Sequence, residues 1–465
     1  MHQGVGQKEE QEEVTGLVCQ ETDLHDGQMK EVTVEDQKVL LVRTKGQYSA
    51  VGSRCSHYNA PLIKGTLVGE RVRCPFHGAC FNVRTGDIEE YPGLDSLPTY
   101  KVEQPFNSMK LTKRVREMCT VQPDVKHTIL LVGGGPASLV CAETLRQNCY
   151  QGRIVIITKD SLPPFDKPKL SKAMNVESSN ILLRQDDFYQ QYGIEMWIGK
   201  EVVSVNPTKK SVMMSNGSSV LYDQLLISTG CRARSLSCPG SDLKGVHLLQ
   251  CYDDMLEEAN VKFFMNNKVK EIRGENGKVT FCFSSANVDC FFSVCFSGVV
   301  PNTDFLAGSD VAVDSRKAVI VDKFMRTNVP DIFSAGDVTS FPLTIRRDQS
   351  VNIAHWQMAH AHGRVAALNM LNKPTTIESI PFFWSVLGGK SIRYAGYGEG
   401  YTEIIFKGKV EERKFLAFYI KDEVVVAASS LMFDPAVAHV AELMAKGTVI
   451  TKAQAQSEDL SWLQM

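Results

Sequence analysis

Two short strings near the N-terminus hold residues that could bind metal. Cys55-Ser-His57 and Cys74-Pro-Phe-His77 each place one thiol close to one imidazole, and sixteen residues separate the two strings. Two sulfur and two nitrogen ligands satisfy a [2Fe–2S] cluster in which Cys binds one iron and His binds the other. Zinc can use the same four atoms, but zinc fingers usually keep their two Cys together and their two His together. The mixed pairs therefore favour the cluster and one-electron transfer, with zinc as the alternative.

Strands must carry the two loops that hold these ligands. The segment Val32–Arg43 alternates apolar and polar residues around a turn, and Phe81–Val83 leads into the turn Thr85-Gly86-Asp87. Pro61 and Pro75 stiffen the loops, because proline fixes its own φ angle. We therefore expect two loop tips on a small β-domain.

The segment from about Val14 to Val102 resembles a Rieske domain. In that family the high-potential members add a disulfide between the two ligand loops. In this sequence Asn59, Ala60 and Phe76 stand where those Cys would be expected. The resemblance therefore implies a low-potential, ferredoxin-like centre.

A second set of residues with binding chemistry follows the charged segment 109–126. An apolar strand over residues 128–132 runs into a Gly-rich turn, a helix is expected over Ser138–Asn148, and a second strand over Arg153–Thr158. Such a βαβ unit binds a dinucleotide, because the glycines let the backbone approach the pyrophosphate and the helix N-terminus binds that anion. Ser138 replaces the last Gly or Ala of the fingerprint, and Asp160 follows the second strand, where an acidic residue holds a ribose hydroxyl. The expected contacts here are Gly133, Gly135, Ser138 and Asp160.

Two later strings resemble the signature of FAD-dependent pyridine-nucleotide reductases. They are Gln224–Gly230, which ends in Thr-Gly, and Asp331–Val338, which contains Gly-Asp. Disulfide reductases carry a Cys pair after the first βαβ unit, whereas Pro163–Lys172 holds no Cys and resembles the ferredoxin-reductase and apoptosis-inducing-factor branch. The resemblance implies flavin contacts at Lys167, Lys172, Thr229, Gly230, Arg234, Gly336, Asp337, His355, Trp356 and Trp384, with Asp337 on the ribityl chain and Lys172 as the catalytic candidate.

Cys290 and Cys295 form a CxxxxC string in an apolar run. Residues five apart on a strand point to opposite faces, so we expect two core thiols. His360 and His362 are expected to lie on the face of a helix that spans His355–Leu371.

Over nearly its whole length the chain resembles the apoptosis-inducing factor-like (mitochondrion-associated 3) flavoproteins. The resemblance implies a multidomain fold: an all-β Rieske domain, an α/β Rossmann-type FAD/NAD(P) reductase and an α+β C-terminal domain. It also implies electron transfer from NAD(P)H through FAD to the [2Fe–2S] cluster. The expected division is a polar tail (1–13), Rieske domain (14–108), linker (109–126), first FAD part (127–254), remnant of an NAD-binding domain (255–300), second FAD part (301–379) and C-terminal domain (380–465).

The nicotinamide site of such a reductase is expected to be incomplete. A full reductase carries a second GxGxxG between the Thr-Gly and Gly-Asp strings, but no two glycines between Cys231 and Pro330 form GxG. By resemblance, the first βαβ unit of the NAD-binding domain is missing between Asp254 and Met255. Without a helix N-terminus for the cofactor's phosphates, NAD(P)H use should be impaired. An internal deletion, as by splicing, is favoured over a diverged loop.

Composition limits the remaining choices. The chain holds 465 residues with a net charge of −2, so neither nucleic acid nor an anionic membrane is an expected partner. No stretch approaches the ~18 apolar residues that cross a bilayer. The thirteen scattered Cys fit a reducing, intracellular setting, and the polar, acid-rich start resembles neither a signal peptide nor a transit peptide. The family resemblance implies the mitochondrion, with the cytoplasm as the alternative.

The electron acceptor, a protein or a small molecule, is not indicated, and a homodimer stays open. Two other functions also stay open. One is a non-catalytic pro-apoptotic or partner-binding protein. The other is a stand-alone Rieske carrier or redox sensor.

Overall fold

The structure is a computed structural model that forms two compact units. Unit 1 comprises Met1–Glu117, Leu343–Gln349 and Glu378–Met465, and unit 2 comprises Met118–Pro342 and Ser350–Ile377. The structure describes residues 19–20, 23–34, 36–100, 113–171, 177–234, 238–243, 246–247, 271–275, 278–283, 287–289, 293–294, 298–387 and 389–464.

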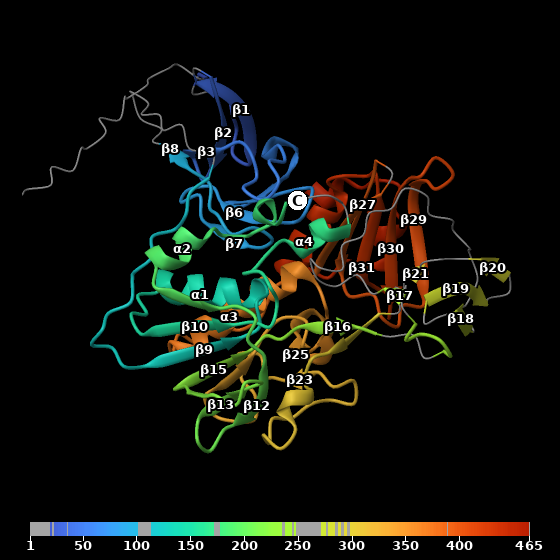
Figure 1. The fold of residues 1–465 in the computed structure, drawn as a ribbon. Helices are drawn as coiled ribbons and strands as arrows, with labels where there is room; N and C mark the ends of the chain where they lie inside the picture. Colours follow the sequence, from blue (N-terminus) through green and yellow to red (C-terminus); the bar gives the residue numbers. More distant parts are fainter. Residues whose placement is uncertain are drawn as a thin grey trace, which may run out of the picture. The chain divides into compact units, whose positions relative to one another are not determined.

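The N-terminal part of unit 1 is built from two four-stranded antiparallel sheets (Figure 1). The first has the order β1-β2-β3-β8, and Val39, Leu41 and Ala50 are among the apolar residues buried against it. The predicted turn after Val32 joins its first two strands. The second sheet has the order β4-β5-β6-β7 and carries the second ligand string between β5 and β6. The strands are β1 (Gln28–Val34), β2 (Gln37–Thr44), β3 (Gln47–Gly52), β8 (Thr99–Tyr100), β4 (Thr66–Val68), β5 (Arg71–Arg73), β6 (Cys80–Asn82) and β7 (Ile88–Glu90).

The C-terminal part of unit 1 is a five-stranded antiparallel sheet with helices. Its order is β27-β28-β31-β30-β29, and the apolar side of α4 packs into one core with the sheet through residues such as Phe418 and Val440. The elements are β27 (Phe382–Leu387), β28 (Lys390–Gly396), β29 (Glu403–Lys409), β30 (Lys414–Lys421), β31 (Val424–Leu431), α4 (Ala436–Ala445) and α5 (Lys452–Gln456).

The centre of unit 2 is a parallel sheet of five strands with the order β11-β10-β9-β15-β24. Its three middle strands are apolar runs, as expected for a sheet that is buried on both faces. Figure 1 shows α1 and α3 side by side over this sheet. The elements are β9 (Thr128–Val132), α1 (Pro136–Gln147), β10 (Arg153–Ile157), α2 (Asp186–Gln191), β11 (Ile194–Trp197), β15 (Gln224–Ile227), β24 (Ile332–Ser334) and α3 (Trp356–Met370).

Gly363 explains how closely the two helices approach each other. A Cβ atom at this position would lie 2.2 Å from the carbonyl oxygen of Ala137, so only glycine fits between α3 and α1. The close contact brings the start of α1 next to α3, and both helices supply residues to the cavity described below.

Smaller sheets complete unit 2. In the predicted NAD-binding remnant the described secondary structure consists of strands, and β18 and β19 pair antiparallel with Glu275 opposite Lys278. The predicted turn residue Gly277 lies outside the described residues. Cys290 and Cys295 lie outside the described residues. The strands are β12 (Val202–Asn206), β13 (Ser211–Met214), β14 (Ser219–Leu221), β16 (Cys231–Ala233), β17 (Val246–His247), β18 (Glu271–Glu275), β19 (Lys278–Phe283), β20 (Asn287–Asp289), β21 (Ser293–Val294), β22 (Val299–Pro301), β23 (Val319–Ile320), β25 (Thr339–Leu343) and β26 (Gln349–Asn352).

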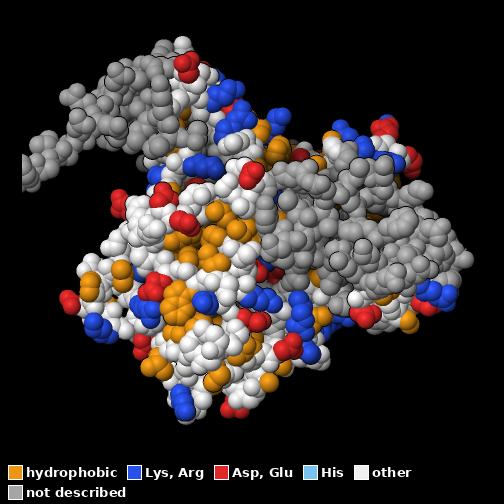
Figure 2. All heavy atoms as spheres, in the orientation of Figure 1, with side chains coloured by type: hydrophobic (Ala, Val, Ile, Leu, Met, Phe, Trp, Pro, Cys, Tyr) orange, Lys and Arg blue, Asp and Glu red, His pale blue; other side chains and the backbone are white. Residues whose placement is uncertain are grey.

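Charges of both signs are mixed on the surface. Figure 2 shows Lys and Arg side chains interspersed with Asp and Glu over the described part of the face in view, as the balanced composition predicts. Among the described residues, no helix is both long enough and apolar enough to span a bilayer.

Candidate redox sites

The two ligand loops of unit 1 have the same hydrogen-bonding pattern. In the first loop the N–H of Cys55 donates to Ala60 O, and the N–H of Asn59 donates to Cys55 O. In the second, the N–H of Cys74 donates to Ala79 O and that of Gly78 to Cys74 O. Asn59 (φ 54°) and Gly78 (φ 77°) both turn the chain through the left-handed region. The sequence therefore folds into two matching turns, each presenting one Cys and one His.

The two predicted sulfur ligands face each other. Cys55 and Cys74 are both fully buried, and their thiols hydrogen bond to each other. This contact, reinforced by burial, raises the pKa of Cys55, and the same contact lowers the pKa of Cys74. In the first loop the backbone N–H groups of His57 and Tyr58 donate to the Cys55 sulfur. In the second loop those of Phe76 and His77 donate to the Cys74 sulfur. Such N–H···S bonds help to set the reduction potential of an iron–sulfur cluster.

The two imidazoles lie side by side. The rings of His57 and His77 are 4.8 Å apart between centroids and nearly perpendicular. His77 is 8% exposed, and burial followed by repulsion from His57 lowers its pKa to about 2, so its ring is neutral and able to bind metal. The Nδ1 atom of His77 is buried without a hydrogen-bond partner in the described structure, which is costly unless a metal binds it. The donor set thus fits a cluster.

Trp384, predicted to lie beside the flavin, contacts the imidazole pair. Its ring centroid is 4.9 Å from that of His77 and 6.0 Å from that of His57, both with edge-on geometry. Tyr58 also contacts the pair, because its ring stacks on that of His57 with centroids 4.0 Å apart. The sequence analysis missed Tyr58, although an aromatic residue directly after a ligand His was a signal for it.

Unit 2 contains a cavity of about 510 Å³ at the carboxyl ends of the parallel strands. This is where ligands bind in open α/β sheets. Nine predicted residues line it: Gly133, Gly135, Asp160, Lys167, Thr229, Gly230, Gly336, Asp337 and Trp356. Three strings far apart in the sequence therefore meet around one space.

The Gly-rich turn shows why small residues are needed at this wall. Gly133 has φ 128°, and a Cβ there would lie 2.1 Å from Ser228 O. A Cβ on Gly134 would lie 2.5 Å from Thr158 Oγ1, whereas nothing lies within 4 Å of a Cβ on Gly135. Gly133 is thus required by the fold, and Gly135 leaves open space in front of the first turn of α1, where a pyrophosphate binds.

Asp337 is the most perturbed acid of the cavity. Burial raises its pKa to about 6, against the opposing effects of Lys167 and of a hydrogen bond to the backbone of His355. A second acid–base contact lies nearby, since Lys167 Nζ is 3.8 Å from Asp160 Oδ2. The cavity therefore offers hydrogen-bond acceptors for hydroxyl groups and a cation for a phosphate or flavin.

Other predicted contacts do not line the cavity. Ser138 is buried and its Oγ is 2.6 Å from Ser228 Oγ, so it serves the close packing of helix on strand that the last Gly of the fingerprint provides. Arg234 is exposed. His355 caps α3 by accepting from the N–H of Gln357, and burial lowers its pKa to about 4. Lys172 lies outside the described residues.

The structure adds residues that the sequence analysis missed. Arg232 lines the cavity, and Asn302 Oδ1 (3.1 Å) and Asp304 (2.9 Å) hold its guanidinium. Asn302 also donates a hydrogen bond to Thr229 O. Its place directly after the apolar strand residues Val-Val-Pro was the sequence signal that could have identified it. His362 accepts a hydrogen bond from the N–H of Gly336 at 3.2 Å and therefore supports the Gly-Asp turn. The sequence analysis had predicted only that His362 lies on a helix face.

Three sequence families match this chain in order. They are "Rieske [2Fe-2S] domain" over residues 15–101, "Pyridine nucleotide-disulphide oxidoreductase" over 127–254 and 246–363, and "Reductase C-terminal" over 382–462. Apoptosis-inducing factor 3 of Mus musculus is 38% identical over 533 aligned positions, which cover 97% of this chain and 88% of that protein. The human protein of the same name matches equally well. The chain belongs to the apoptosis-inducing factor 3 family.

Membership of the apoptosis-inducing factor 3 family confirms the fold class and the enzyme class. The chain is an FAD-dependent oxidoreductase that transfers electrons, and its families imply a [2Fe–2S] cluster, FAD and NAD(P)H. A probable ferredoxin reductase of Castellaniella defragrans is 25% identical over 66% of this chain and 91% of its own length.

Solved structures show the same fold. A ferredoxin reductase from Rhodopseudomonas palustris superposes with a TM-score of 0.67 at 22% identity, over 73% of this chain and 100% of that one. The reductase of a covalent putidaredoxin reductase–putidaredoxin complex gives 0.67 at 19% identity, over 73% and 98%.

The alignment with the mouse apoptosis-inducing factor 3 is longer than this chain. It spans 533 positions although this chain has 465 residues, so dozens of aligned positions of that protein have no counterpart here. The reductase family matches in two segments that meet at residues 246–254, beside the predicted junction of Asp254 and Met255.

Proposed function

We propose that this chain passes single electrons between FAD in the cavity of unit 2 and a [2Fe–2S] cluster bound by Cys55, His57, Cys74 and His77. The observation that carries the assignment of ligands is the buried His77 Nδ1 without a hydrogen-bond partner in the described structure, next to two buried thiols in contact. FAD supplies the conversion between two-electron and one-electron chemistry, and the cluster supplies a one-electron store.

The chain's own residues bind and orient these groups. The start of α1 and the Gly-rich turn would hold the pyrophosphate of FAD, and Asp337 would accept a hydrogen bond from its ribityl chain. Lys167 places a cation at the cavity wall. The N–H groups around Cys55 and Cys74 stabilise the anionic sulfurs. Lys172 is proposed as the catalytic contact by family resemblance alone.

Use of NAD(P)H is proposed to be impaired. The aligned positions without a counterpart and the absence of GxG between Cys231 and Pro330 support the loss of the βαβ unit that would bind the cofactor's phosphates. An electron donor other than NAD(P)H, such as a reduced protein, would then reduce this chain. A protein or a small molecule would accept the electrons from it.

A visible spectrum with iron, flavin and zinc analysis of the purified chain tests this function. We expect two irons and one FAD per chain, little zinc, and reduction of flavin and cluster by dithionite. We also expect reduction by NADH to be at least 100-fold slower than in a reductase that retains both nucleotide sites. A chain with zinc in place of iron, or without flavin, would contradict the proposal.

A role in cell death is a second candidate, favoured by the names of the mouse and human relatives. Death-promoting activity that survives Cys55→Ser and Gly135→Asp would support a role independent of redox chemistry. We also propose a mitochondrial or cytoplasmic location, which cell fractionation tests. A homodimer is a further proposal, which light scattering tests.

A further inference from the structure

The second ligand loop is covered by the C-terminal domain of unit 1. Trp384 of β27 lies against the ring of His77, and Phe382 of the same strand lies against Gly78. A Cβ on Gly78 would be 2.6 Å from Phe382 Cγ, so the ring of Phe382 occupies the space that a side chain would take. Only glycine therefore fits at this position beneath the ring of Phe382.

Arg393 of β28 holds the other half of the same loop. Its Nε donates to Pro75 O at 3.2 Å, and its guanidinium carbon is 5.6 Å from the centre of the Phe76 ring. Arg393 is 3% exposed, and Asp434 lies 3.7 Å from its Nη2. All four residues from Pro75 to Gly78 therefore contact the C-terminal domain.

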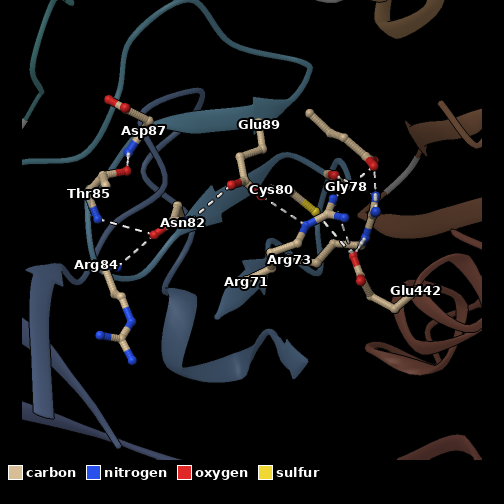
Figure 3. A network of polar contacts seen from close by, with 11 residues as sticks. Arg71, Arg73, Gly78, Cys80, Asn82, Arg84, Thr85, Asp87, Glu89 and Glu442 are labelled. Carbon is tan, nitrogen blue, oxygen red and sulfur yellow. Dashed lines mark hydrogen bonds and ion pairs between the residues drawn. The ribbon is translucent and has the colours of Figure 1, made fainter. Parts of the chain in front are cut away.

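A buried ion pair connects this loop to helix α4. Arg73 is fully buried, and its Nη1 donates to Gly78 O at 2.9 Å while its Nε contacts Glu442 of α4, which is 2% exposed (Figure 3). Glu90 takes a second bond from Arg73 at 2.7 Å. Cys80 donates to Glu442 at 3.2 Å and is itself fully buried. Arg73 thus joins the end of the ligand loop to a carboxylate from another domain.

We propose that the Arg73–Glu442 pair is a latch that keeps the second ligand loop, with His77, closed against the C-terminal domain. His57 is only half-buried and Tyr58 is exposed, so the closed state leaves a separate protein only the first loop as a route to the cluster. Parting of the two domains would add a second, shorter route through His77. The inference rests on the proposed function, because it assumes that a cluster occupies the site at His77.

The physical reason is the cost of separating buried charges. Arg73 and Glu442 were both removed from water, and their attraction in a poorly solvated site is large only while they touch. Replacing Glu442 by Gln keeps the shape of the side chain but removes the charge. Arg73 keeps Glu90 as a partner within its own domain, so the loss falls on the contact between domains.

Cys80 provides a readout that does not depend on the cluster. Its thiol is buried beside Glu442, so alkylation by N-ethylmaleimide, followed by peptide mass spectrometry, reports opening. We expect Glu442→Gln to increase the alkylation rate of Cys80 at least 10-fold. The matched control is Glu403→Gln in the same domain, which removes a carboxylate from an exposed pair with Lys452 and should leave the rate unchanged. Equal rates in Glu442→Gln and the native chain would refute the latch.

The second measurement is electron transfer to an external protein. The full chain is reduced with dithionite and mixed with oxidised cytochrome c. One electron leaves the reduced cluster and reduces one ferric haem to ferrous, with no bond made or broken, and visible circular dichroism of the cluster follows the reaction. We expect the bimolecular rate constant to rise at least 10-fold in Glu442→Gln and in Trp384→Ala, but not in Glu403→Gln.

The sign of this effect separates opening from simple electrostatics. Cytochrome c is basic, so removing a carboxylate would slow its approach if the domains stayed together. A rate constant that falls or stays level in Glu442→Gln would overturn the proposal. If Glu442→Gln fails to fold, Glu442→Asp, which keeps the charge but shortens the side chain, should raise both rates, and unchanged rates would refute the latch. A chain without a cluster would instead count against the proposed function, since the Cys80 rates can still be compared.

Discussion

We expect Asp337 to make flavin binding depend on pH. Burial raises its pKa to about 6, so in the chain without FAD the carboxyl is protonated at pH 5 and ionised at pH 7. A raised carboxyl pKa means that the folded state favours the protonated form. The unliganded fold therefore loses stability as pH rises from about 4 to about 6.

FAD binding should follow the opposite trend, because the carboxylate is the better acceptor for a ribityl hydroxyl. We expect the FAD dissociation constant to be about 10-fold higher at pH 5 than at pH 7, since one pKa unit corresponds to a factor of ten. Fluorescence titration of the apoprotein with FAD measures it. Asp337→Asn should bind more weakly at pH 7 and show a flat profile. An equally steep profile in that variant would assign the titration to another group.

Gly133 and Gly135 should respond differently to the same added methyl group. Gly133→Ala places a Cβ against Ser228 O and strains a φ of 128°, so we expect about 2–3 kcal/mol less unfolding free energy and loss of FAD. Gly135→Ala meets no protein atom within 4 Å and should fold normally but bind FAD at least 10-fold more weakly, because its methyl group enters the cavity. Urea unfolding and flavin content distinguish these outcomes. Equal stability losses in both variants would contradict this account.

At the scale of elements, the contact between α1 and α3 holds the cavity together. Gly363→Ala would place a Cβ 2.2 Å from Ala137 O and force the helices apart. We expect the free energy of unfolding to fall by about 2 kcal/mol, even after a gain of about 1 kcal/mol in helix propensity. Arg364→Ala, one position along α3, should change it by less than about 0.5 kcal/mol. Chemical denaturation of both variants, monitored by far-UV circular dichroism, measures the two free energies of unfolding. Similar losses in both variants would show that the close approach of the helices does not contribute to stability.

Elements with a strong local pattern could be predicted from the sequence to within a residue or two. The helix expected over Ser138–Asn148 spans Pro136–Gln147, and the one expected over His355–Leu371 spans Trp356–Met370. Proline is favoured in the first turn of a helix, which explains the earlier start of the first one. The strands that flank the predicted turn at Gly277, β18 and β19, pair antiparallel, although Gly277 itself lies outside the described residues.

Contacts between distant segments could not be predicted in this way. Nothing local to Glu442 indicates that it pairs with Arg73, 369 positions away, or that Trp384 packs on His77. The position of the Arg232 guanidinium at the cavity likewise depends on Asn302, which directly follows β22 and is distant in the sequence. Spacing indicated the four candidate ligands and the Gly-rich turn because those patterns are local. The residues that support them are visible only once the chain is folded.

At the scale of the whole molecule, we propose that the chain keeps two redox sites while the route for nicotinamide is incomplete. Unit 1 contains the proposed cluster ligands and the domain that packs on their second loop, and unit 2 contains the proposed FAD cavity. The residues proposed for these two sites lie outside the predicted junction of Asp254 and Met255. The proposed loss of NAD(P)H use can therefore be reversed without altering either site.

Restoring the missing segment is the test of that view. We expect a chain that carries, between Asp254 and Met255, the segment that the mouse relative has at this position to reduce its flavin with NADH at least 100-fold faster than the original chain. The inserted βαβ unit supplies a helix N-terminus for the pyrophosphate, whereas reduction by dithionite needs no such site and should not change. Stopped-flow absorbance of the flavin measures both rates.

The control is the same insertion with the first glycine of its pyrophosphate turn changed to Val, which should return NADH reduction to the original rate because a side chain there blocks the tight turn. Rapid reduction of the original chain by NADH would instead mean that its nicotinamide site lies elsewhere. In that case the residues between Asp254 and Pro330 would have to bind the cofactor without a GxG turn.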